Sequence, residues 1–258
     1  MPVRLAPTFR DRLAEASRPQ VGMWVCSGST VAAEICAGSG LDWLLLDTEH
    51  SPLSLETLLT LLQTVAAYPV TPMVRASVGD PVVLKRLLDV GAQNLLVPMV
   101  DSAEQAEEIV RAVRYPPRGV RGVGSALSRS ARWNRVPGYL DKADEFVSLF
   151  VQIESVAGVE AAAEIAAVEG VDGVFVGPSD LAASMGLLGQ QTHPEVTDAV
   201  LRTFEAVRST GKPVGVNAFD PVQAQRYLDA GASFILVGAD VTLLAAGSDG
   251  LAKRFIPG

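Results

Sequence analysis

Eight short apolar stretches, each followed by a segment with helical periodicity, run through this chain of 258 residues. They are rich in Val, Leu and Ile and show little polar alternation, which is typical of parallel strands buried on both faces. The stretches cover residues 21–25, 43–47, 70–75, 94–99, 148–154, 173–177, 213–217 and 234–238. Eight strand–helix units predict an α/β fold in which residues 1–258 form a single closed parallel (β/α)8 barrel, the TIM barrel. A doubly wound open sheet is the alternative, but the first stretch lacks the glycine-rich dinucleotide fingerprint of such sheets.

The composition narrows the range of partners. A net charge of −8 and a pI near 4.8 argue against a nucleic-acid partner, which would need a basic surface. No window approaches the roughly 18 uninterrupted apolar residues of a membrane helix, and the N-terminal segment lacks an apolar core of signal-peptide length. We therefore expect a cytoplasmic protein that binds neither membranes nor nucleic acid. Cys26 and Cys36 are too few for a disulfide framework and are expected to be small buried residues.

Two neighbouring strands are followed by acids. Glu154 closes the fifth apolar stretch, and Asp180 comes shortly after the sixth. Because the carboxyl ends of parallel barrel strands meet at one rim, these two carboxylates are expected to lie close together. Two carboxylates without an adjacent basic residue favour a hard, oxygen-ligated metal ion. The chain has only two histidines, which excludes a three-histidine zinc site.

His50 and Arg75 follow two earlier strands toward the same rim. His50 has Asp47 and Glu49 beside it in sequence and suits general acid–base chemistry, although an isolated histidine is more often structural. Arg75 closes a buried strand and therefore requires an anion, either an oxyanion of a substrate or a salt-bridge partner. The candidate partners are Asp47, Glu49 and Asp89. Asp89 stands near the end of a predicted helix, where an acid opposes the helix dipole, so it either orients a basic group or lies on the surface.

The lysines argue against one class of mechanism. None of the four, Lys85, Lys142, Lys212 and Lys253, stands at the carboxyl end of a predicted strand. Schiff-base catalysis in a barrel needs a lysine at that rim. Metal-assisted enolisation is the mechanism that remains.

Two segments depart from a minimal barrel. Residues 116–144 are too long for an ordinary connection and carry five arginines, which indicates an anionic substrate group, a subunit contact or a solvated arm packed through Trp133 and Tyr139. The polar residues 186–194 are expected to break the helix after the sixth strand into two pieces. In the GPSD turn before that helix, the backbone N–H groups of Ser179 and Asp180 could receive a substrate carboxylate.

Taken together, these residues resemble the HpcH/HpaI family of class II pyruvate aldolases, of the 4-hydroxy-2-oxoheptane-dioate aldolase type. The matching phrases are LLLDTEHSP, PMVRAS, LLDVGAQNLLVPMV, YPPRGVRGVGSALSRSARWN, VQIES, EGVDGVFVGPSDLAASMG and LDAGASFILVGAD, which together reach from Val21 to Asp240. The resemblance implies a (β/α)8 barrel with an exchanged last helix and a homo-hexamer of paired subunits. It also implies a divalent metal cation, Mg, Mn or Co.

The resemblance assigns roles to particular positions. Glu154 and Asp180 match the metal ligands, and Gln152 matches a position that lines the metal pocket. His50 matches the base, Asp47 and Asp89 match the acids that orient it, and Arg75 matches the group that holds the enolate. Asn217 is a departure, because several relatives carry an aliphatic side chain there, and a polar amide could favour a hydroxylated substrate.

The sequence therefore predicts a carbon–carbon lyase that adds a pyruvate or hydroxypyruvate enolate to an aldehyde and gives a 4-hydroxy-2-oxo acid. The alternatives are a CoA-ester lyase of the same superfamily and a barrel that binds ligands without catalysis. The arginine loop is the one basic segment that could hold CoA phosphates. Intact carboxylates, histidine and arginine at the rim argue against a loss of catalysis.

Overall fold

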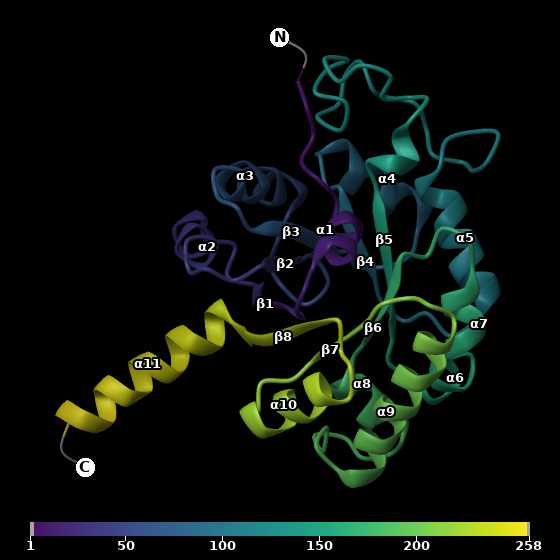
Figure 1. Ribbon diagram of the computed structural model, residues 1–258. Coiled ribbons are helices and arrows are strands. Elements are labelled where there is room, and N and C mark those ends of the chain that lie inside the picture. The colour runs from purple at the N-terminus through teal and green to yellow at the C-terminus, as the bar shows by residue number, and fades with distance from the viewer. Residues whose placement is uncertain (1–2, 257–258) are drawn as a thin grey trace.

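A computed structural model describes residues 3–256 and shows a closed barrel of eight parallel strands that pair in chain order, β1 to β8 and back to β1 (Figure 1). The strands are β1 (Gln20–Val25), β2 (Trp43–Asp47), β3 (Thr71–Arg75), β4 (Asn94–Val97), β5 (Ser148–Ile153), β6 (Gly173–Val176), β7 (Val214–Asn217) and β8 (Phe234–Ala239). The predicted (β/α)8 barrel is therefore confirmed, and each predicted strand lies where the apolar runs placed it.

The helices are α1 (Phe9–Glu15), α2 (Thr30–Ala37), α3 (Leu55–Val65), α4 (Pro81–Asp89), α5 (Ala103–Val113), the short 3-10 helix η1 (Ala143–Glu145), α6 (Val156–Glu160), α7 (Ala162–Ala167), α8 (Pro178–Ser184), α9 (Pro194–Ser209), α10 (Pro221–Asp229) and α11 (Asp240–Phe255). Helices α2 to α10 lie on the outside of the barrel, whereas α1 lies across one of its ends and α11 extends away from it (Figure 1). The break between α8 and α9 confirms the predicted interruption at residues 186–194.

Two helix starts show how the sequence sets the local structure. The Asp80 carboxylate accepts hydrogen bonds from the first backbone amides of α4, and Asp220 does the same for α10. Each is followed by a proline at the first helical position, where the missing N–H costs nothing. The Asp-Pro pairs therefore fix where these helices leave the strand ends, and with them the geometry of the rim.

The fourth strand is shorter than predicted. It ends at Val97 because Pro98 has no N–H to give to a neighbouring strand. The next residue, Met99, has a φ of 58°, so the chain turns sharply here instead of continuing the strand.

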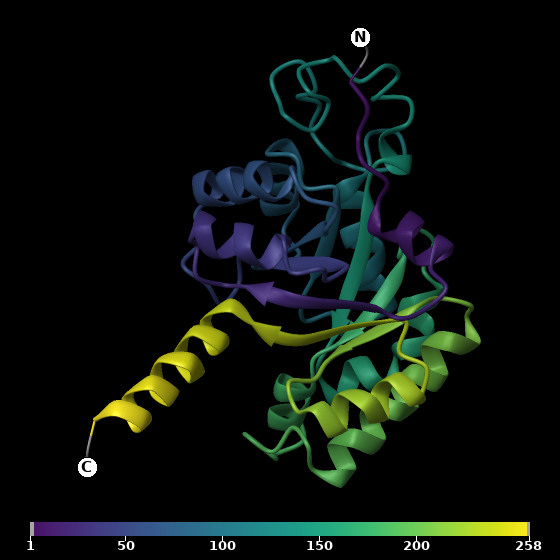
Figure 2. The same ribbon diagram turned by 60° about the vertical axis from the view of Figure 1, so that its left-hand side comes forward.

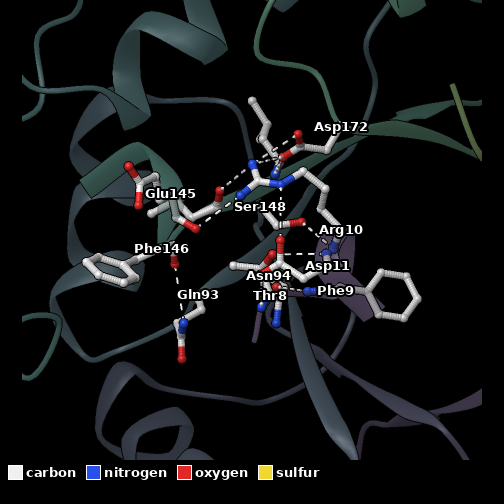
Figure 3. Close-up of polar contacts among 12 residues, drawn as sticks. Thr8, Phe9, Arg10, Asp11, Gln93, Asn94, Glu145, Phe146, Ser148 and Asp172 are labelled. Atoms are coloured by element: carbon white, nitrogen blue, oxygen red, sulfur yellow. Dashed lines mark hydrogen bonds and ion pairs between the residues drawn. The ribbon is translucent and has the colours of Figure 1, made fainter. Parts of the chain in front are cut away.

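The N-terminal helix α1 closes the end of the barrel where the strands begin, a feature that the sequence did not predict. Phe9 is completely buried, with its ring centroid 5.0 Å from Trp43, 5.5 Å from Phe150 and 5.4 Å from Phe234. Its backbone N–H donates to Oδ1 of Asn94 at 2.7 Å (Figure 3). The aromatic ring fills the interior at this end, and the amide of the first β4 residue holds it in place.

Arg10 fastens the same helix to the barrel from outside (Figure 3). Its guanidinium forms an ion pair with Asp172 at 3.3 Å and donates to the carbonyl oxygen of Glu145 at 3.0 Å. Asp172 in turn accepts a hydrogen bond from the backbone N–H of Leu149 at 2.8 Å. The helix is thus tied to β5 and to the segment before β6.

Residues 116–144 form a compact lobe of turns beside the N-terminal segment (Figures 1 and 2). The two segments are joined by a hydrogen bond of 3.3 Å from the backbone N–H of Val3 to the carbonyl oxygen of Arg135. Tyr139 is buried and stacks on Phe146 with ring centroids 5.7 Å apart, whereas Trp133 is 51% exposed. The prediction that this loop packs through its aromatic side chains is therefore confirmed for Tyr139 and wrong for Trp133.

The last helix, α11, extends away from the barrel (Figures 1 and 2). Leu243, Leu244, Leu251 and Phe255 on this helix are each more than 60% exposed. A row of exposed large apolar side chains on a projecting helix is typical of a surface that another molecule covers. Among residues 3–256, no helix is long and apolar enough to cross a membrane.

Replacing Phe9 by Ala is expected to lower the free energy of unfolding by about 3–5 kcal/mol, because it removes a fully buried aromatic ring and leaves a cavity. Denaturant unfolding of the purified protein measures this. Leu188→Ala is the control, because Leu188 is 81% exposed and its loss should change stability little. Equal losses in the two variants would show that α1 does not seal the barrel.

Candidate active site

Arg75 is the centre of the polar rim at the carboxyl ends of the strands. The register of β2 and β3 sets Asp47 beside Arg75. The guanidinium donates from Nε to Asp47 Oδ1 at 2.8 Å and from Nη2 to Asp47 Oδ2 at 2.9 Å. Its Nη1 lies 2.9 Å from Oε2 of Glu49, and its plane lies over Trp24 at 4.3 Å from the ring centroid. The predicted salt bridge is confirmed for Asp47 and Glu49.

The arginine keeps donors for a ligand after these contacts. A guanidinium has five N–H groups, and two of those of Arg75 donate to Asp47, whereas Nη1 is paired with Glu49 by charge and without a hydrogen bond. Those that remain belong to Nη1 and Nη2. A side chain fixed by two acids and one aromatic ring, with donors to spare, is suited to holding an oxyanion.

Asp47 holds the turn that carries His50. Burial disfavours its ionised form, but the hydrogen bonds and charge of Arg75 outweigh burial and lower the pKa of this carboxyl. Its Oδ2 accepts from the backbone N–H of His50 at 3.3 Å and from the hydroxyl of Ser51 at 3.2 Å. Asp47 therefore positions His50 through the backbone. The imidazole itself lies nearest to Glu49, with Nε2 at 3.9 Å from Oε2, and 68% of the side chain is exposed.

Glu154, directly after β5, is a buried carboxylate whose ionised form is disfavoured by its surroundings. Its Oε1 accepts from the backbone N–H of Met99 at 2.8 Å, and its Oε2 accepts from Nε2 of Gln152. Burial raises the pKa of this carboxyl to about 7, the amide of Met99 opposes the rise, and the charges of Asp180 and Glu49 add to it. The left-handed conformation of Met99 is what aims its amide at Glu154.

Gly177 leaves room for this carboxylate. A Cβ added there would lie 2.7 Å from Oε2 of Glu154 and 2.7 Å from Nε2 of Gln152, too close for any side chain. The glycine at the end of β6 therefore allows Glu154 and Gln152 to pack against the start of α8. Because α8 carries Asp180, the glycine also brings the two predicted ligands to one place.

The donor set fits a divalent cation. Glu154 and Asp180 supply carboxylate oxygens close enough for the charge of one to raise the pKa of the other. The buried Oε1 of Gln152 has no hydrogen-bond partner in residues 3–256 and is a third oxygen at this place. A cation would remove the repulsion between the acids and give these oxygens a partner. Three or more clustered His, Cys, Asp or Glu ligands do not occur within the described chain.

Asp89 is not part of this rim. It ends α4, beside the start of β4, and barrel helices run opposite to the strands, so it lies toward the other end of the barrel. Burial raises the pKa of its carboxyl, and the charges of Arg121 and Lys85 oppose the rise. The predicted contact of Asp89 with Arg75 is therefore wrong, and in one chain Asp89 does not orient His50.

A cavity of about 280 Å³ lies beside Asp180, between α8, β7 and α10. Ser179, Asn217 and Tyr227 are among its lining residues. Asn217 is not free in the way the sequence suggested, because its Oδ1 accepts a hydrogen bond of 2.8 Å from Nε1 of Trp24. The same indole lies against Arg75. The asparagine at position 217 therefore helps to fix the indole that supports Arg75, and it also lines the cavity.

Sequence reasoning missed the parts played by Trp24 and Met99. Trp24 lies on β1 with its ring under Arg75, and a polar-tipped aromatic near the end of a barrel strand was the available signal. Met99 acts through its backbone amide, and no property of a methionine side chain indicates such a role.

Comparison with known proteins agrees with this geometry. The family model of HpcH/HpaI aldolase/citrate lyase matches residues 20–246. A 4-hydroxy-2-oxo-heptane-1,7-dioate aldolase of Escherichia coli is 52% identical over 241 residues, covering 93% of this chain and 92% of that protein. The solved structure of an HpcH/HpaI aldolase/citrate lyase family protein from Burkholderia cenocepacia J2315 has a TM-score of 0.92 at 38% identity, covering 96% of this chain and 99% of the other.

A more distant structure shares the fold alone. Protein CitE of Mycobacterium tuberculosis, solved with magnesium and pyruvate, has a TM-score of 0.56 at 15% identity and covers 86% of this chain and 86% of its own.

A (β/α)8 barrel with paired acids and an anchored arginine at its carboxyl rim has the features of a barrel enzyme suited to metal-assisted chemistry on an anionic substrate. The matches are specific enough to go further. This chain belongs to the HpcH/HpaI aldolase/citrate lyase family, a family of divalent-metal-dependent aldolases, and it is a carbon–carbon lyase.

The metal-free protein should lose stability as the pH rises from about 4.5 to about 7. The unfolded carboxyl of Glu154 gives up its proton near 4.5 and the folded one near 7, so the folded state binds more protons in this window. Glu154→Gln removes that loss and should therefore raise the melting temperature by a few degrees at about pH 8 and by less at about pH 5. Scanning calorimetry after chelation and desalting measures this.

Glu164→Gln provides the matched control for this measurement, since Glu164 is an exposed acid on α7. It should change the melting temperature equally little at both pH values. An effect of Glu154→Gln that does not depend on pH would contradict the raised pKa.

Proposed function

We propose that this lyase reversibly cleaves a 4-hydroxy-2-oxo acid to an aldehyde and a pyruvate or hydroxypyruvate enolate, with Glu154 and Asp180 as the ligands of Mg, Mn or Co. The observation that carries the proposal is the buried carboxylate of Glu154 close to the exposed carboxylate of Asp180, beside an arginine that keeps free donors. The name of the Escherichia coli relative supports a 4-hydroxy-2-oxo acid as the substrate class.

Each residue of the rim has a defined task in this reaction. The bound cation would supply a Lewis acid to the keto and carboxylate oxygens of the substrate. His50 takes the proton of the C4 hydroxyl, the C3–C4 bond breaks, the aldehyde leaves, and the electron pair passes to the enolate. Arg75 stabilises the enolate oxygen through its free N–H groups. The enolate is then protonated at C3, and His50 is the donor.

The cavity beside Asp180 is suited to the rest of the substrate. Ser179, which precedes the proposed metal ligand Asp180, and the side-chain amide of Asn217 both line this cavity. We propose that the aldehyde portion lies here. The amide nitrogen of Asn217 could donate to a hydroxyl or carbonyl oxygen, since its oxygen is used by Trp24.

The assembly is proposed to be a homo-hexamer whose paired subunits exchange α11. The projecting helix and its exposed leucines support the exchange, because they need an apolar cover. The proposed role of Asp89 also requires a second copy, since only an Asp89 from a neighbouring chain could approach His50. The cytoplasmic location stays a prediction.

Two variants separate proton transfer from metal binding. His50→Ala should lower aldol cleavage and C3 proton exchange of pyruvate by about 100-fold or more, since it removes the acid–base group. It should leave metal affinity unchanged, whereas Asp180→Asn should weaken metal binding directly. Titration of chelated protein with Mg, Mn and Co, beside both activity assays, measures this.

The reverse pattern, in which His50→Ala loses the metal and Asp180→Asn keeps it, would invert the two assignments. Full cleavage after verified removal of metal would refute the metal-dependent mechanism.

Leu244→Asp should break the proposed helix exchange and give a smaller species in size-exclusion chromatography with light scattering. A charge placed among the exposed leucines would have to be buried without a partner in the pair. Ala246→Asp is the control, because two residues along a helix face opposite sides and Ala246 is also exposed. Wild-type protein that elutes as a monomer would contradict the proposed assembly.

A further inference from the structure

A second polar cavity lies at the end of the barrel opposite to the catalytic rim. It has a volume of about 300 Å³ and lies between the N-terminal segment, the starts of β3 and β4, and the loop 116–144. Four arginines line it, Arg4, Arg12, Arg129 and Arg132, and no aspartate or glutamate of the described part of the chain does. We call this cavity the arginine pocket. Such a concentration of positive charge is unexpected on a chain with a net charge of −8.

The positive charge of the arginine pocket is not balanced by a carboxylate of residues 3–256. Other arginines, Arg10, Arg18, Arg75, Arg114, Arg118 and Arg226, form ion pairs with carboxylates. Across residues 3–256, none of the four pocket arginines has an ion pair. Guanidinium groups that gather without a carboxylate are disfavoured unless an anion joins them.

Arg129 and Arg132 converge on one point. A Cβ added at Gly91 would lie 2.5 Å from Nη1 of Arg129 and 3.2 Å from Nη1 of Arg132. Gly91 has a φ of 98°, so a glycine is needed there both for the backbone and for the two side chains above it. The two guanidinium groups are therefore close enough to act on a single ligand.

Backbone carbonyls fix these two side chains without neutralising them. Arg129 donates from Nη1 to the carbonyl oxygen of Val90 at 3.2 Å, and Arg132 donates from Nη1 to the carbonyl oxygen of Arg129. Burial, together with the charge of Arg132, lowers the pKa of Arg129 to about 10. The lowered pKa means that burial and the neighbouring charge disfavour the charged form of Arg129, and a bound anion would stabilise that form.

The two amide side chains of the pocket already have partners. Asn94 accepts from the backbone N–H of Phe9 (Figure 3) and donates to the carbonyl oxygen of Pro72. Gln93 donates to the carbonyl oxygens of Ala6 and Phe146. The charged groups that line the pocket are arginines, and guanidinium forks are matched in shape and charge by carboxylate and phosphate oxygens.

We propose that the arginine pocket binds a compact dianion, either phosphate or a small dicarboxylate, at a site separate from the catalytic rim. The ligand bridges Arg129 and Arg132 and joins the loop 116–144 to the N-terminal segment through Arg4 and Arg12. This proposal does not depend on the proposed reaction.

The test uses full-length protein that has been chelated and desalted, so that anions cannot bind through a metal. Phosphate and succinate are titrated separately by calorimetry at constant ionic strength, with chloride as the reference. We expect at least one of the two to bind and to raise the melting temperature as its concentration increases. Binding of phosphate alone or of succinate alone supports the proposal and identifies the ligand chemistry.

Variants locate the site. The double substitution Arg129→Gln with Arg132→Gln should weaken the anion by at least about tenfold, because it removes two charge-assisted contacts. Arg135→Gln is the matched control, since Arg135 lies on the same loop, is exposed and does not line the pocket. Pyruvate C3 exchange with metal added back, and the melting temperature in chloride, show that the double variant is folded. Failure of both anions to bind, or equal binding by wild type and the double variant, would overturn the proposal.

Discussion

The buried ion pair between Asp47 and Arg75 is the interaction on which the rest of the rim depends. The register of β2 and β3 creates it, and Trp24 and Glu49 complete the setting of the guanidinium. Without that positive charge, the acids around it would repel one another in a place that water hardly reaches. Arg75 therefore makes the acidic rim possible and still keeps free donors, which the proposed reaction uses for the substrate oxyanion.

The two ends of the barrel carry clusters of opposite charge, acids at one end and arginines at the other. At the carboxyl rim, Glu154 is buried near other acids and is kept in place by the amide of Met99, which suits the rim to a cation. At the other end, Phe9 seals the interior, and Arg129 and Arg132 lie together without a carboxylate. Under the two proposals, one chain of acidic composition would hold a cation at one end and an anion at the other.

The fold was predictable from the sequence where burial alone dictates the pattern. Apolar runs of strand length gave all eight strands, and Pro98 accounts for the early end of β4. The role of α1 was not predictable, because a short helix has too little periodicity to show what it covers. The residues of α11 do not show its projection by themselves, since its leucines would read the same against the barrel or away from it, and only the family resemblance implied an exchanged last helix (Figure 1).

The sequence by itself determined the part of the site that follows from strand ends. Asp47, Arg75 and Glu154 close strands or follow them directly, and parallel strands bring such residues to one rim whatever the loops do. Only the tertiary structure decided that Asp89 lies toward the other end, because a residue at the end of a helix is placed by the packing of that helix. The tertiary structure also decided which carboxylates reach the guanidinium of Arg75. It likewise decided that Arg129 and Arg132 come together beside Gly91, because contacts between segments distant in sequence exist only after the chain has folded.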